Sequence, residues 1–115
     1  MAETGSFISA VSFDKLPFRE QLIRAVSGEA SIAGLDGQQA VLNVFDNRRQ
    51  RNQWKNKTDL ELIKQSFSVF KDKDSAEYKS MMSIPKDHKV YKQIGKMVDT
   101  YIDPKQKLED ITNGA

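Results

Sequence analysis

The chemistry of this sequence centres on one carboxylate, Glu29, at the point where an amphipathic helix is expected to end. Apolar residues recur at helical spacing from Phe18 to Val26, and Gly28 favours a stop just before the glutamate. Small neighbours on both sides leave room for a large molecule to approach. Apolar surroundings would favour the protonated carboxyl, which is the form that a general acid needs. The alternative is an ordinary solvated glutamate at a helix terminus.

Two polar residues at the end of the next apolar helix pattern are candidates for the same site. Asn47 and Arg48 are expected to project from that helix toward the first one. Asn47 can offer a donor and an acceptor to a sugar N-acetyl group or to the backbone beside Glu29. Arg48 is expected to support the fold through a buried or partly buried ion pair, because arginine suits bidentate pairing.

The segment Phe67 to Phe70 alternates apolar and polar residues and is expected to form a turn or short extended piece lining a groove. Ser68 could bond a substrate or orient Glu29. Because no histidine base is evident beside it, nucleophilic serine chemistry is not expected. Phe67 is a candidate for substrate contact, with a position in the core as the alternative.

The strongest charge run of the sequence, RRQRNQWKNK over Arg48 to Lys57, contains Trp54. Basic residues interleaved with an aromatic residue are typical of a groove that contacts phosphates and stacks bases. The alternatives are a solvated helix end and loop, or a Trp54 that packs on the core or against a sugar face. A basic rim would also help to capture anionic peptidoglycan.

Four separated blocks of the sequence resemble, in order, those of the SleB/CwlJ-type cell-wall hydrolases, the spore-cortex-lytic enzymes and their phage and bacterial relatives. The blocks are SGEAS at 27–31, GQQAVLNVFDNRRQ at 37–50, KQSFSVF at 64–70 and DITNGA at 110–115. Family members continue past the Gly-Ala element into a Thr-His-Tyr-like segment, whereas this sequence stops at Ala115. A truncated, processed or split domain is therefore expected.

The resemblance implies a mainly α, lysozyme-like domain of about five helices that cleaves the β-1,4 bond between N-acetylmuramic acid and N-acetylglucosamine. It implies that Glu29 is the catalytic acid, that Asn47, Phe67, Ser68 and Trp54 bind substrate, and that peptidoglycan strands are the partner. A lytic transglycosylase is favoured over a hydrolase, because it needs only one catalytic carboxylate. If there is a second carboxylate, Asp36 and Asp46 are the candidates.

Two other classes of function stay open at this point. One is a non-enzymatic phage structural or ejection component, or an inactive truncated domain, with other virion or lysis proteins as partners. The other is a small helical nucleic-acid-binding protein that uses the basic run, although a net charge of +2 does not by itself imply a nucleic-acid partner.

The composition narrows the chemistry further. The 115 residues bound a single domain, 1–115, with a lead-in at 1–12 and a polar tail at 105–115. There is no cysteine, so disulfides and thiolate chemistry are excluded, and one histidine, His88, does not favour a metal site. No cofactor is expected. The sequence shows neither a membrane span nor a signal peptide, so delivery to a cell wall would need a phage virion, a lysis protein or a larger parent polypeptide.

Five helices are expected from the periodic patterns. The first runs from about Leu16 to Ser27, and the second follows a capping box at Asp36 and Gln39 and ends among residues 48–52. The third opens with a capping box at Thr58 and Glu61 and ends near residue 65. The fourth follows Asp74 and Glu77, and the fifth covers about 87–101.

Overall fold

The computed structural model describes residues 12–30, 33–51 and 57–112, and within these ranges it is all helical, with no strand. The mainly α fold predicted from the sequence is therefore confirmed. The helices are α2 (Phe18–Ala30), α3 (Gly34–Arg51), α4 (Asp59–Ser66), α5 (Ala76–Ser83) and α6 (Lys89–Ile102), with the short 3-10 helices η1 (Phe13–Lys15) and η2 (Ser68–Lys71). Most of the predicted lead-in lies outside the described residues.

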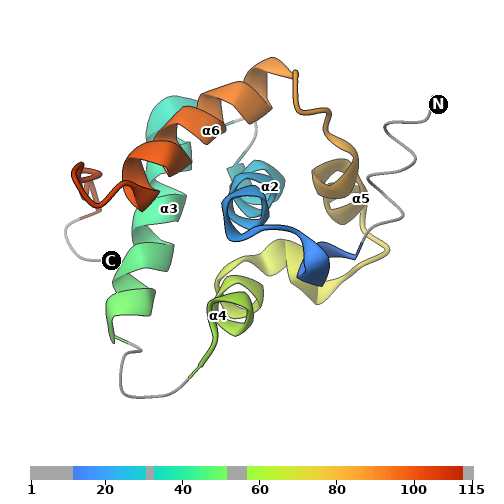
Figure 1. Cartoon of the computed structure of the whole chain (residues 1–115). Coiled ribbons are helices and arrows are strands. Elements are labelled where there is room, and N and C mark those ends of the chain that lie inside the picture. The colour runs from blue at the N-terminus through green and yellow to red at the C-terminus, as the bar shows by residue number, and fades with distance from the viewer. Residues whose placement is uncertain (1–11, 31–32, 52–56, 113–115) are drawn as a thin grey trace.

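Helix α2 lies at the centre, and the other four helices surround it (Figure 1). Its apolar residues Leu22, Ile23, Ala25 and Val26 are completely buried. They pack with residues from every other element in one core, which adds Phe13, Leu42, Phe45, Leu62, Ile63, Phe67, Val69, Met81, Met82, Tyr91, Ile94 and Val98. Burial of this apolar surface is the main force that holds the short helices together.

The predicted end of the first helix is wrong, because α2 continues through Gly28 to Ala30. At Gly28 the missing side chain serves packing and does not stop the helix. A Cβ atom there would lie 3.1 Å from Val69 Cγ2 and 3.2 Å from Met81 Cβ, so glycine allows α2 to approach η2 and α5 closely. The glycine that ends the connection to α3 is Gly34, whose φ of +76° lies in the left-handed region.

The capping box predicted at the third helix is confirmed, whereas the one at the second helix is not formed. Thr58 Oγ1 accepts the Glu61 backbone N–H at 3.1 Å, and Glu61 Oε1 accepts the Thr58 N–H at 2.8 Å. Helix α3 begins at Gly34, so Asp36 lies inside its first turn and not at the cap. Local spacing alone could not fix a start that depends on a glycine in the left-handed region.

The caps of α5 and α6 also differ from the expected ones. Ser75 caps α5 by accepting the Tyr78 N–H at 3.0 Å, in place of the predicted pair of Asp74 and Glu77. His88 is exposed, as predicted, but its Nδ1 also accepts a backbone N–H at 3.0 Å and thereby caps α6. Both caps satisfy N–H groups that a helix start leaves without a partner.

Arg24, in the middle of α2, is completely buried and joins three helices. Its Nε donates to the Glu20 carboxylate at 2.9 Å, and its Nη1 donates to the carbonyls of Met81 and Ile84, each at 3.0 Å. The guanidinium also lies over the ring of Tyr91 in α6, 5.4 Å from its centroid. Since the last carbonyls of a helix lack partners inside it, Arg24 acts as the C-terminal cap of α5.

Arg49 makes a second polar junction, at the far end of α3. Its guanidinium forms two parallel bonds of 3.0 Å with Asp59 of α4, and Nη1 donates to the Tyr101 hydroxyl of α6 at 3.0 Å. That hydroxyl donates in turn to Asp46 at 2.8 Å. Burial raises the pKa of Tyr101 to about 12, with Arg49 opposing and Asp46 adding to the shift. The junction therefore joins α3, α4 and α6.

Candidate functional site

Glu29 and Ser68, 39 residues apart in the sequence, meet at the end of α2. The Ser68 backbone N–H and hydroxyl both lie 3.1 Å from Glu29 Oε1, and the hydroxyl lies 3.3 Å from Oε2. Ser68 is held there by the residue before it, because Phe67 is only 1% exposed and stacks on Phe45 of α3. A buried aromatic anchor thus fixes the two donors that orient the carboxylate.

The two residues share a shallow pocket of about 350 Å³. Its other described lining residues are Gly28, Val69, Lys71, Asp72, Ser75 and Glu77. Glu29 itself is exposed. The predicted apolar surroundings of its carboxyl are therefore wrong: α2 continues past Gly28, and its last turn points the carboxylate outward among hydroxyls and charges.

The carboxylates that accompany Glu29 are not the predicted ones. Asp46 is engaged by Tyr101 on the α3–α6 side, and Asp36 is exposed in the first turn of α3. Neither is among the described residues that line the pocket, whereas Asp72 and Glu77 are. The sequence placed Glu77 only at the start of a helix, and the folding of η2 and α5 against α2 brings Asp72 and Glu77 into the pocket with Glu29.

Asn47 and Arg48 lie elsewhere than predicted. Asn47 Nδ2 donates to the Asp110 carboxylate at 3.1 Å, so it fastens the C-terminal segment to α3 and is not among the described residues that line the Glu29 pocket. Arg48 is exposed, and its neighbour Arg49 makes a partly buried ion pair, with Asp59, in its place. Successive helix residues differ by about 100° around the axis, so a shift of one position changes the face entirely.

Of the aromatic candidates, Phe67 belongs to the core and has no free face for a substrate. The alternative interpretation of Phe67, as a core residue, is the one confirmed. Trp54 lies outside the described residues, as does most of the segment between α3 and α4. Arg49, within the same basic run, is already committed to Asp59 and Tyr101.

The C-terminal segment runs along α3 in the part that the structure describes, up to residue 112. The Glu109 carbonyl accepts a bond from Gln39 Nε2 at 2.7 Å, and the Ile111 N–H donates to Asn43 Oδ1 at 3.0 Å. The contact of Ile111 with Asn43 and the bond from Asn47 to Asp110 pair the second and fourth blocks of the sequence. The bonds from Ser68 to Glu29 pair the third block with the first.

No family model, curated protein or solved structure matches this chain. Among the described residues, no group of three or more His, Cys, Asp or Glu side chains is arranged to hold a metal ion. Nor is any helix in the described ranges long and apolar enough to cross a membrane. What the chain does must therefore be argued from its own residues.

Proposed function

We propose that this chain is a peptidoglycan-cleaving glycosidase of lysozyme-like type, with Glu29 as its acid and base. The proposal rests on the resemblance of the four blocks to cell-wall hydrolases. The observation that carries it is the contact of Ser68 with the Glu29 carboxylate. Two residues that the resemblance assigns to one site, and that lie far apart in the sequence, share one solvent-open pocket.

In the proposed reaction, Glu29 donates its proton to the glycosidic oxygen as the bond from the muramic acid C1 breaks through an oxocarbenium-like state. The carboxylate then takes the proton of the muramic C6 hydroxyl as that oxygen attacks C1, which gives a 1,6-anhydro product and restores the acid. A glycan strand that covers the pocket would exclude water from Glu29 and favour the protonated form that the first step needs.

Ser68 is a positioning residue in this scheme. Its backbone N–H fixes the Oε1 oxygen, while its hydroxyl can rotate between the two carboxylate oxygens because it lies 3.1 and 3.3 Å from them. Such a hydroxyl can donate a hydrogen bond to the Glu29 carboxylate and accept one from the protonated Glu29 carboxyl, so it can bond both forms during the reaction. Ser68→Ala should therefore lower kcat more than it changes KM.

Two carboxylates in the pocket make hydrolysis the alternative outcome. A hydrolase needs a second carboxylate about 5 to 10 Å from the acid, as nucleophile or as general base for water. Asp72 and Glu77 line the pocket with Glu29, but Asp72 Oδ1 already accepts the Asp74 N–H at 2.9 Å. Glu77 is therefore the better candidate, and the products of Glu77→Gln separate the two reactions.

The test is digestion of purified peptidoglycan by the chain and by Glu29→Gln, with the products read by mass spectrometry. Glutamine keeps the shape and can still accept from Ser68, so the fold is expected to survive. Glu109→Gln, on the exposed C-terminal segment, is the matched control. Anhydro-muramic products that Glu29→Gln abolishes and Glu109→Gln retains would support the proposal. The absence of products from the unaltered chain would favour the non-enzymatic role.

A further inference from the structure

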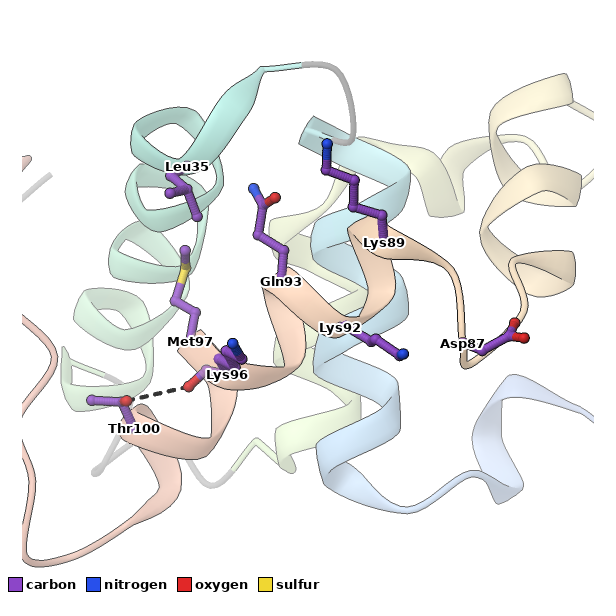
Figure 2. A pocket seen from close by; sticks show the side chains of 8 residues that line it. All are labelled: Leu35, Asp87, Lys89, Lys92, Gln93, Lys96, Met97 and Thr100. Carbon is purple, nitrogen blue, oxygen red and sulfur yellow. Dashed lines mark hydrogen bonds between the residues drawn. The ribbon is translucent and has the colours of Figure 1, made fainter.

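A basic groove follows the exposed side of α6, away from the residues that carry the proposed chemistry. It has a volume of about 750 Å³ and lies between α6 and the start of α3. Lys89, Lys92 and Lys96 leave α6 along it, and Leu35 of α3 faces Met97 across it (Figure 2). A second groove of about 590 Å³ shares Lys92 and Lys96 and adds Lys86 and Arg19. One row of lysines thus borders two hollows.

The charges of this row are not neutralised within the described part of the chain. All three α6 lysines are exposed, and none of them makes an ion pair with a described residue. The nearby carboxylates are mostly in use: Asp99 binds Arg19 at 2.6 Å, and Glu20 binds the buried Arg24. Among the described lining residues of the two grooves, only Asp87 is an acid without such a pair.

The position of the row on its helix adds to the local positive potential. The first turn of α6 contains no acidic residue, although the N-terminus of a helix carries partial positive charge and favours acids there. Lys89 and Lys92 therefore lie where cations repel the helix end. An anion bound in the groove would meet the lysines and the helix terminus together and would relieve this repulsion.

The chemistry of the lining residues indicates what kind of anion fits. The row is all lysine, and lysine binds phosphate as a point charge without the bidentate geometry that arginine provides. It extends about 10 Å along the helix axis, which calls for several charges and not for one small ion. Leu35, 57% exposed, and Met97 give the groove an apolar floor for carbon linkers between charges.

The two grooves offer no exposed aromatic ring, among their described lining residues, on which a nucleic-acid base could stack. No aromatic side chain is among the described residues that line the groove of Figure 2, and Tyr91 in the second groove is only 5% exposed. Binding of single-stranded nucleic acid typically uses exposed aromatic rings on which bases stack. The lining therefore fits a polymer with phosphates and short carbon units better than it fits a single-stranded nucleic acid.

We infer that the lysine row of α6 binds an anionic phosphodiester polymer of the cell wall, of the glycerol-phosphate kind. The choice of a wall polymer rests on the proposed function, and the charge complementarity rests on the groove itself. Binding there would hold the chain on the wall while Glu29 acts at a different face. The row is thus a wall-attachment surface distinct from the catalytic pocket, with which it shares no lining residue among those described.

The test measures binding of the full chain to purified glycerol-phosphate teichoic acid, free of peptidoglycan, over a range of salt concentrations. The variant is K89Q/K92Q/K96Q, and glutamine keeps the helix propensity. The control is K73Q/K79Q/K107Q, which removes the same charge from exposed positions elsewhere. Circular dichroism checks that both variants fold.

The row variant should bind at least tenfold more weakly at low salt, and the slope of log K against log salt should fall by about 2 to 3, since each lost phosphate contact removes about 0.7 to 0.9. The control should stay within about twofold of the unaltered chain. Equal losses in both variants, no binding by the unaltered chain, or tighter binding of single-stranded DNA would each overturn the inference.

The same preparations separate this inference from the proposed function. Glu29→Gln should lose cleavage and keep polymer binding, because Glu29 lies outside both grooves. A chain that binds the polymer without cleaving peptidoglycan would leave the attachment surface standing and the glycosidase refuted. A chain that cleaves peptidoglycan without binding the polymer would support the glycosidase and refute the attachment surface.

Discussion

Replacing Arg24 by methionine is expected to be the most damaging single change in α2. Methionine fills a similar volume but leaves the Glu20 carboxylate without its 2.9 Å partner and the carbonyls of Met81 and Ile84 without theirs. Each buried acceptor left without a donor typically costs about 1 to 3 kcal/mol, and three acceptors lose theirs here. Arg24 Nη2 has no hydrogen-bond partner within the described structure, which places the expected cost near the lower end, at about 3 kcal/mol.

A double-mutant cycle with Glu20→Gln separates the two parts of that cost. If the unpaired carboxylate dominates, the double variant recovers most of the stability. We expect little recovery, because the carbonyls of Met81 and Ile84 remain without a donor, and because Lys86, 3.5 Å from Glu20, still compensates its charge. Arg24→Lys keeps the charge but cannot reach Glu20 and α5 together, so it should recover only part.

The assay is urea denaturation followed by far-ultraviolet circular dichroism, with hydrogen exchange of the α5 amides as a local readout. A domain of this size is stable by about 5 to 15 kcal/mol, so the expected loss moves the midpoint clearly. The α5 amides should lose protection before those of α6. A loss below about 1 kcal/mol for Arg24→Met, or full recovery in the double variant, would refute the view that Arg24 is the cap of α5.

Three further predictions follow from the helices. Gly28→Ala places a Cβ 3.1 Å from Val69 and should cost about 1 kcal/mol, as urea midpoints would show. Gly95→Ala meets the end of the Arg19 side chain at 3.2 Å and Ile23 Cδ1 at an ordinary contact distance of 3.6 Å, so it should be neutral or stabilising. Burial raises the folded-state pKa of Tyr101 from 10 to about 12, so the unfolded chain loses this proton at lower pH than the folded chain. The free energy of unfolding should therefore fall by about 2 kcal/mol between pH 10 and pH 12, as alkaline denaturation would show. It should fall less in Tyr101→Phe. Thr58→Ala removes a formed capping box and should cost about 1 kcal/mol in thermal unfolding.

Local signals in the sequence sufficed for the class of fold and for the number of helices. The α4 capping box needs only two side chains three residues apart, and both are visible in the sequence. The burial of Leu22 and Val26 follows from their helical spacing. Features of this kind depend on neighbours within one helical turn, so they can be predicted without knowledge of the tertiary structure.

Features that depend on a partner helix could not be predicted. Gly28 has the appearance of a helix stop, and only the approach of η2 and α5 explains a glycine inside α2. Arg24 has the appearance of an ordinary polar residue of an amphipathic helix, although its burial requires the carbonyl end of α5, nearly 60 residues away. The Glu29 pocket also depends on a partner helix. The resemblance pointed to Ser68, but the sequence did not indicate Glu77 as a pocket residue, because its position depends on where α5 packs.

Two charges in this structure stand at the unfavourable ends of their helices. Glu29 lies in the last turn of α2, which contains no basic residue, and the lysines of α6 begin in its first turn, which contains no acid. The helix dipole opposes both placements. Proteins commonly violate a local rule of this kind where function requires it. At Glu29 the two donors of Ser68 offset the cost in the free chain. At the lysine row no described side chain makes an ion pair, and the inferred polymer would supply that charge.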